Sequence, residues 1–206
     1  MFGKWHLGDQ PGRWPTDQGF DEWYGVANTT VEAMYTSQPH YDPEIVKPPQ
    51  IVKAKAGEKP QRVKEYNLDT RRTIDRELNE HAIEFMTAKA KEKKPFFAFI
   101  PYTQPHLPVL PHPDFDGKTG NGEHADMLAE MDHNVGQILD TLDKLGIADN
   151  TIVIWTSDNG PEEAPSWTGT AGFWRGNYFT TLEGSLRTSF LIRWPGKIKP
   201  KSVSNE

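Results

Sequence analysis

Two stretches of the chain repeat apolar residues at the spacing of an amphipathic helix. The first covers residues 69–94, where apolar side chains recur every three or four positions with charges between them. We expect Asp69 or Thr70 to cap its start, and Pro95 to stop it. The second covers residues 128–145 and is ended by the glycine that follows. The pattern therefore predicts two long helices.

Continuous apolar runs predict the strands. Residues 96–100, 151–155 and 189–194 are short runs of this kind, and such runs are typical of strands covered on both faces in a parallel sheet. A further short strand is expected at residues 49–53. The order helix, strand, helix, strand predicts an α/β fold, in which crossover helices flank the sheet.

Turn-forming residues fill the remaining segments, in a chain with 17 glycines and 17 prolines. Residues 1–35 are rich in glycine and tryptophan, and we expect a loop with short elements there. Residues 36–66 contain several prolines and a lysine-rich stretch, which predicts a long surface excursion. Residues 101–122 and 160–180 are expected to be loops.

Charge and composition narrow the function. The chain has 23 cationic and 29 anionic side chains and a net charge of −6, which argues against a general nucleic-acid binder. No apolar run is long enough for a transmembrane helix. The absence of cysteine excludes disulfides, thiolate zinc sites and a cysteine nucleophile within the chain. Asn28-Thr29-Thr30 is a glycosylation acceptor pattern, which matters only in a eukaryotic secretory pathway.

Polar residues follow the predicted strand at 151–155. In an open parallel sheet, ligands bind beyond the carboxyl ends of the strands. Asp158 and Asn159 lie there and offer a carboxylate and an amide oxygen, which are hard ligands suited to Ca²⁺ or Mg²⁺. An Asx turn with Gly160 in the left-handed region accounts for the same residues, so both interpretations stay open.

Two further groups are candidates for proton transfer and anion binding. His106 lies in a proline-flanked loop after residues 96–100, where a rigid backbone can aim an imidazole. An exposed loop histidine without a function is the alternative. Lys4 and His6, two positions apart, share one side of an extended segment and form a modest anion site.

Five segments, taken in order, resemble the sulfatase family of the alkaline-phosphatase-like superfamily. They are residues 3–8 (GKWHLG), 15–25 (PTDQGFDEWYG), 94–108 (KPFFAFIPYTQPHLP), 131–160 with its Ser-Asp-Asn-Gly turn, and 180–196 with its Glu-Gly-x-x-Arg and Trp-Pro-Gly elements. The resemblance implies a mostly parallel sheet with flanking helices. It also implies that residues 1–206 are part of a catalytic domain, incomplete at both ends, with 36–66 as a variable excursion.

The resemblance assigns a role to each candidate residue. The resemblance implies hydrolysis of sulfate esters with Ca²⁺, with Mg²⁺ as the alternative metal, and with a formylglycine nucleophile. By motif, Asp158 and Asn159 would be metal ligands, and Lys4 would hold sulfate oxygens. His6 would act as a base on the hemiacetal hydroxyl. His106 would bind sulfate and help to protonate the leaving oxygen.

The chain departs from the family pattern in three places. The nucleophile motif is missing, because Ser37-Gln38-Pro39 lacks the required arginine and lies downstream of the Gly-Lys-Trp-His segment. The motif, and the aspartate pair that completes the calcium shell, are expected upstream of Met1. Tyr178 stands where the family often has a lysine, and Arg175 is the candidate for supplying that charge to the substrate, ahead of Lys118.

The resulting prediction is a sulfuric ester hydrolase acting on a sulfated small molecule or glycan, with no nucleic-acid partner. The isolated 206 residues are expected to be inactive. A phosphodiesterase or phosphonate hydrolase of the same superfamily is one alternative, and a non-catalytic binding module is another. By resemblance alone, we expect the protein to be periplasmic or secreted.

Overall fold

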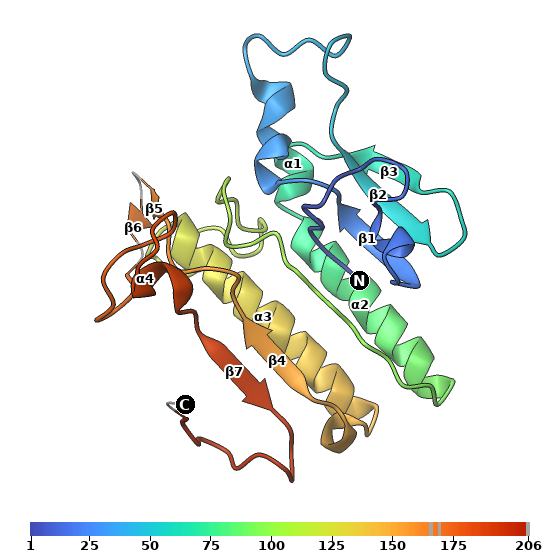
Figure 1. The fold of residues 1–206 in the computed structure, drawn as a ribbon, viewed down its shortest axis with the longest axis vertical. Helices are drawn as coiled ribbons and strands as arrows, with labels where there is room; N and C mark the ends of the chain where they lie inside the picture. Colours follow the sequence, from blue (N-terminus) through green and yellow to red (C-terminus); the bar gives the residue numbers. More distant parts are fainter. Residues whose placement is uncertain (165–166, 169, 205–206) are drawn as a thin grey trace. The chain divides into compact units, whose positions relative to one another are not determined.

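The fold is known from a computed structural model, which describes residues 1–164, 167–168 and 170–204 (Figure 1). The chain divides into two compact units, Met1–Thr141 and Leu142–Glu206, and each is described by itself. Among the described residues, no helix is both long enough and apolar enough to cross a membrane.

The two predicted helices are present. The first is divided into α1 (Leu68–Arg71) and α2 (Ile74–Lys91), and the second is α3 (Glu123–Lys144). The predicted cap is wrong by two or three positions: the Asn67 side chain accepts a hydrogen bond from the Thr70 N–H, and the Asn67 N–H donates to the Thr70 hydroxyl. Two 3₁₀ helices, η1 (Pro15–Asp17) and η2 (Thr30–Ser37), complete the helices of the first unit.

An antiparallel sheet occupies the first third of the chain. It consists of β1 (Glu22–Val26), β2 (Gln50–Lys55) and β3 (Gln61–Glu65) in that order. The strand expected at 49–53 is confirmed as β2. Sequence reasoning missed β3, which makes part of the expected excursion a hairpin. Trp23 pairs with Ala54 in this ladder, and both belong to a buried apolar cluster.

Residues 1–6 run between β1 and the segment at 99–101. The N–H groups of Gly3 and Trp5 donate to carbonyls of β1, and those of Phe2 and Lys4 donate to the segment at 99–101. The bridge from Phe2 to Tyr24 is parallel. The parallel part of the sheet therefore lies here, whereas the assigned ladders are antiparallel.

The prediction of a strand at residues 96–100 is wrong. Phe2 and Lys4 donate to the carbonyls of Phe99 and Pro101, but a parallel ladder also needs bonds in the return direction. Pro101 has no N–H, and the Thr103 N–H donates instead to the Asp75 carboxylate at 2.7 Å. The segment is therefore extended without forming a β-ladder, and its apolar side chains are partly exposed to solvent.

The second unit contains the other two predicted strands, β4 (Val153–Thr156) and β7 (Phe190–Arg193). They pair with each other in antiparallel fashion. The expectation that they are covered on both faces is wrong, because Ile154 is 54% exposed and Phe190 60% exposed. A two-stranded ladder has two open faces and two edges, and apolar composition alone does not supply the layers that cover them. The smaller elements are η3 (Ala148–Asn150), β5 (Glu163–Ala164), β6 (Trp167–Thr168) and α4 (Glu183–Leu186).

Candidate functional site

Lys4 is tied to the start of the loop that carries His106. Its N–H donates to the Pro101 carbonyl at 2.9 Å. The approach is close because position 3 is glycine: a Cβ on Gly3 would lie 2.0 Å from the same carbonyl oxygen. In the first unit, the structure therefore brings together the segments of two predicted site residues.

His6 has an unusual backbone. Its φ is 64°, which places a non-glycine residue in the left-handed region. Its N–H donates to the Ala27 carbonyl at 2.9 Å, and its side chain is exposed. Such strained positions cluster at functional sites. The role of His6 as a base stays a prediction.

His106 is held on both its ring and its backbone. Its Nδ1 lies 2.6 Å from the Thr30 hydroxyl and 3.0 Å from the Leu107 carbonyl oxygen. Its own carbonyl accepts a hydrogen bond from Arg71 at 3.1 Å. An exposed loop histidine without a function would not need these contacts, and the ring is half-buried.

A buried ion pair supports this loop from α1 and α2. Arg71 and Asp75 lie 3.6 Å apart with almost no exposure of either side chain. Asp75 also accepts from both the N–H and the hydroxyl of Thr103, each at 2.7 Å. Burial raises the pKa of Asp75, while Arg71 and the Thr103 bonds oppose that shift.

A second carboxylate supports the loop from α3. Glu130 accepts from the Gln104 side chain at 2.7 Å and from the His112 N–H at 2.8 Å. Burial raises the pKa of Glu130, against the opposing effect of these bonds. On the α2 side, the Tyr102 hydroxyl donates to Asn79 at 2.7 Å. The loop at 101–112 is therefore anchored to two helices.

The Asx-turn interpretation of Asp158 and Asn159 is wrong. The Gly160 N–H donates to the Ser185 carbonyl at 2.8 Å, and Gly160 has no positive φ. The amide nitrogen of Asn159 donates to the Gly160 carbonyl at 2.9 Å, which leaves its Oδ1 for another partner. Asp158 is exposed, at the end of β4. These two oxygens fit a hard cation as part of a larger ligand set.

Close glycine contacts join this turn to Arg175. A Cβ on Gly160 would lie 1.9 Å from the Gly184 carbonyl oxygen, and one on Gly184 would lie 2.0 Å from that of Gly176. The Gly184 N–H donates to the Arg175 carbonyl at 2.9 Å. Three backbone segments are thus packed without side chains between them, so the second unit brings the turn at residues 158–160 and Arg175 together.

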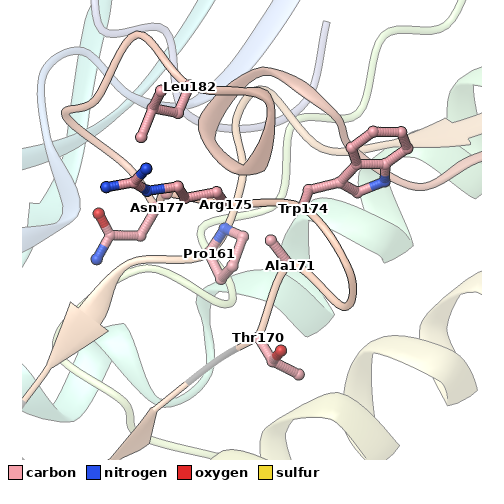
Figure 2. Close-up of a pocket in the computed structure, with 8 residues that line it drawn as sticks. Pro161, Thr170, Ala171, Trp174, Arg175, Asn177 and Leu182 are labelled. Carbon is pink, nitrogen blue, oxygen red and sulfur yellow. The ribbon is translucent and has the colours of Figure 1, made fainter.

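Arg175 also lines a pocket of about 390 Å³ (Figure 2). The other lining residues are Pro161, Thr170, Ala171, Trp174, Gly176, Asn177 and Leu182. Figure 2 shows Arg175 and Asn177 projecting together at one side and Trp174 at the other. The guanidinium of Arg187 lies 4.1 Å from the Trp174 ring. The pocket therefore combines a cationic group, an amide and an aromatic face.

Tyr178, which stands at the position of the family's lysine, and Lys118, the weaker candidate, have other contacts. The Tyr178 ring packs on Phe179 with 4.0 Å between centroids, and its N–H donates to the Pro161 carbonyl. Lys118 lies 4.4 Å from the Phe115 ring, in the first unit. Arg175 thus stays the candidate for the missing lysine.

Among the residues that the structure describes, no cluster of three or more histidine, cysteine, aspartate or glutamate side chains is arranged to hold a metal ion. Metal binding by Asp158 and Asn159 therefore stays a prediction, which would require further ligands from outside these residues. Sequence reasoning missed Thr30, Arg71, Asp75 and Glu130. For Arg71, Asp75 and Glu130, the available signal was a charged residue on the apolar face of a predicted helix. Thr30 offered no such signal.

Comparisons with known proteins agree with these motifs. A family model described as Sulfatase matches residues 1–206. The chain belongs to the sulfatase family. The mouse N-acetylgalactosamine-6-sulfatase is 34% identical over 213 residues, which cover 100% of this chain and 39% of the relative. The chain thus spans about two fifths of the length of that curated relative.

Solved structures with the same fold include one described as a sulfatase. The PsFucS1 sulfatase from Pseudoalteromonas sp. matches 96% of this chain and 42% of its own, with a TM-score of 0.85 and 25% identity. A structure described as Ps i-CgsB in complex with k-i-k-neocarrahexaose matches 94% of this chain and 44% of its own, with a TM-score of 0.70 and 25% identity. The predicted alkaline-phosphatase-like α/β fold is therefore confirmed.

Proposed function

We propose that the protein containing this chain hydrolyses sulfate esters of carbohydrates. The sulfatase match across all 206 residues carries the proposal. The carbohydrate class rests on the named activity of the mouse relative and on the glycan in the Ps i-CgsB structure. The protein would act in the periplasm or outside the cell, as the resemblance suggests.

The residue roles follow from their chemistry. Lys4 would bind sulfate oxygens, and His6 would accept a proton during turnover. His106 would give a proton to the leaving oxygen as the sulfur–oxygen bond breaks. Arg175 would bind the anionic substrate from the pocket that it lines. Fixed cations stabilise a transferring group whose negative charge is spread over several oxygens.

Asp158 and Asn159 would hold the calcium ion, with Mg²⁺ as the alternative metal. When bound, such an ion supplies positive charge that polarises the sulfate oxygens. Hard cations of this kind take about six to eight oxygen ligands, so the protein must supply others. The formylglycine nucleophile would likewise lie outside these residues, since the chain has no cysteine and its Ser37 lacks the motif's arginine.

Sulfate release tests the proposal. The full sulfatase that contains this chain should release sulfate from 6-sulfated N-acetylgalactosamine and from an aryl sulfate. His106→Gln and Asp158→Asn should each lower kcat by about 100-fold or more. A calcium chelator should abolish activity. Glu80→Gln, a matched carboxylate change on the exposed face of α2, should leave kcat unchanged.

Two outcomes would overturn the proposal. Hydrolysis of a phosphate diester or phosphonate without sulfate release would assign the protein to phosphoryl chemistry. Binding of a sulfated sugar, with no turnover under any metal condition, would assign it to the non-catalytic binding modules.

A further inference from the structure

Three polar atoms form a triangle of close contacts at the Nδ1 side of the His106 ring. The Thr30 hydroxyl lies 2.6 Å from His106 Nδ1 and 2.7 Å from the Leu107 carbonyl oxygen. The Leu107 oxygen lies 3.0 Å from the same Nδ1. Thr30 is fully buried, so water does not replace any of these contacts.

Counting hydrogens assigns the protons in this triangle. The Leu107 oxygen can only accept, and the Thr30 hydroxyl has one hydrogen to give. If that hydrogen went to Nδ1, the Leu107 carbonyl oxygen would lie at hydrogen-bond distance from the Thr30 oxygen and from Nδ1, and neither contact would contain a hydrogen. If it goes to Leu107, and Nδ1 carries its own hydrogen, every contact joins a donor to an acceptor. Only the second arrangement satisfies all three contacts.

We propose that Thr30 is a positioning residue that, with the Leu107 carbonyl, holds His106 in its Nδ1–H form and leaves Nε2 facing the reaction. In the sequence, Thr30 is the third position of a glycosylation acceptor pattern. Its carbonyl accepts from the Tyr66 hydroxyl at 3.3 Å, and the His106 carbonyl accepts from Arg71, so both partners are anchored.

The proposal fixes how His106 can act, and this part rests on the proposed function. With a hydrogen already on Nδ1, neutral His106 has only a lone pair at Nε2. It can therefore protonate the leaving oxygen only from the imidazolium form. The Nε2 proton moves to that oxygen as the oxygen takes the electron pair of the broken sulfur–oxygen bond. The imidazole returns to its neutral Nδ1–H form, with the bonds to Thr30 and Leu107 unchanged.

Nitrogen and carbon chemical shifts of isotopically labelled histidine test the proton assignment in the 206-residue chain, without any need for turnover. Neutral His106 should show the Nδ1–H form and a slowly exchanging Nδ1–H proton signal in the wild type. Thr30→Ser, which keeps the hydroxyl, should retain both. Thr30→Val, which is nearly isosteric, should lose the proton signal and raise the population of the Nε2–H form, because only the longer bond to Leu107 remains.

Activity supplies the second measurement, in the full sulfatase. Thr30→Val should lower kcat by about 10- to 100-fold with a smaller change in KM, and Thr30→Ser should restore most of it. Circular dichroism must show that both variants melt like the wild type. An Nε2–H form in the wild type, or an unchanged proton signal in Thr30→Val, overturns the positioning role even if sulfate is released. A protein that releases no sulfate but shows the expected shifts overturns only the catalytic role of His106.

Discussion

Asp75 shows what a single buried charge does for the candidate site. It is paired with Arg71 in a region where neither side chain is exposed, and it binds the Thr103 backbone that leads to His106. Removal of one partner of a buried pair leaves the other charge uncompensated, which is more costly than the pair itself. Asp75→Asn should therefore lower the free energy of unfolding by about 3 kcal/mol or more.

Urea unfolding followed by circular dichroism measures this loss. Glu80→Gln removes the same charge from an exposed position of the same helix and should change the free energy of unfolding by less than about 0.5 kcal/mol. Equal effects of the two substitutions would show that the buried pair does not stabilise the loop.

Asp126 predicts a pH dependence of stability. It accepts from the Thr119 hydroxyl at 2.6 Å, the Thr119 N–H at 2.7 Å and the Gly117 N–H at 2.8 Å. These bonds hold the pKa of Asp126 below its ordinary value of 3.8, and the bond from the Thr119 hydroxyl has the largest effect. On acidification, the unfolded chain therefore takes up this proton first. The stabilisation by Asp126 is present above pH 3.8 and is lost as pH falls through the lowered pKa.

The comparison of wild type with Asp126→Asn isolates that contribution. At pH 6 the variant should have the lower urea midpoint, and the difference should shrink at pH 3. Asp140→Asn, at an exposed position of the same helix, should differ little from the wild type at either pH. A gap for Asp126→Asn that stays constant or widens at pH 3 would contradict the assignment.

Some of the candidate site residues can be predicted from the sequence, and others cannot. Lys4, His6, His106, Asp158 and Asn159 belong to short contiguous motifs, so a linear pattern can single them out. Thr30 lies 76 residues from His106 in the chain, and its hydroxyl is informative only after folding brings the two together. The Thr30 hydroxyl donates to the backbone carbonyl of Leu107, and Arg71 donates to the backbone carbonyl of His106. Backbone carbonyls carry no residue-specific signal.

At the scale of elements, periodicity predicts helices better than strands. The two helices follow from apolar spacing because their hydrogen bonds are local. A strand depends on donors in another segment, and residues 96–100 fail as a ladder because Pro101 lacks an N–H and Thr103 donates to Asp75. The proline was visible in the sequence, whereas the partner of Thr103 was not.

The glycine contacts in the second unit give an element-scale prediction. A methyl group on Gly184 would lie 2.0 Å from the Gly176 carbonyl oxygen and 2.9 Å from that of Arg175. Gly184→Ala should push these segments apart and lower the free energy of unfolding by about 1–3 kcal/mol.

Gly136→Ala is the matched control, since no atom lies within 4 Å of its Cβ and it sits inside α3. That change should stabilise the chain by about 0.5–1 kcal/mol. Urea midpoints that move in the same direction for both substitutions would contradict the close packing.

At the scale of the whole molecule, the candidate residues are divided between two units. Lys4, His6 and His106 belong to Met1–Thr141, while Asp158, Asn159 and Arg175 belong to Leu142–Glu206. The first group consists of a lysine and two histidines, and the second combines a carboxylate, an amide and a guanidinium. The order of motifs along the sequence reveals this division, but only the folded units show which neighbours hold each group.

The small number of candidate ligands predicts weak calcium binding by the 206 residues alone. Asp158 and Asn159 offer two oxygens to an ion that prefers about six to eight, and sites poor in charged ligands bind in the millimolar range or more weakly. A ligand at a concentration well below its Kd adds almost nothing to stability, so about 0.05 mM Ca²⁺ should leave the melting temperature of this chain unchanged. Isothermal titration should give a Kd of about 1 mM or higher, and Asp158→Asn should abolish the residual heat.

Asp149→Asn, which changes an exposed carboxylate of the same unit, is the control and should leave that heat unchanged. Micromolar binding that survives Asp158→Asn would place the calcium ligands elsewhere in the chain and remove Asp158 and Asn159 from the proposed metal site.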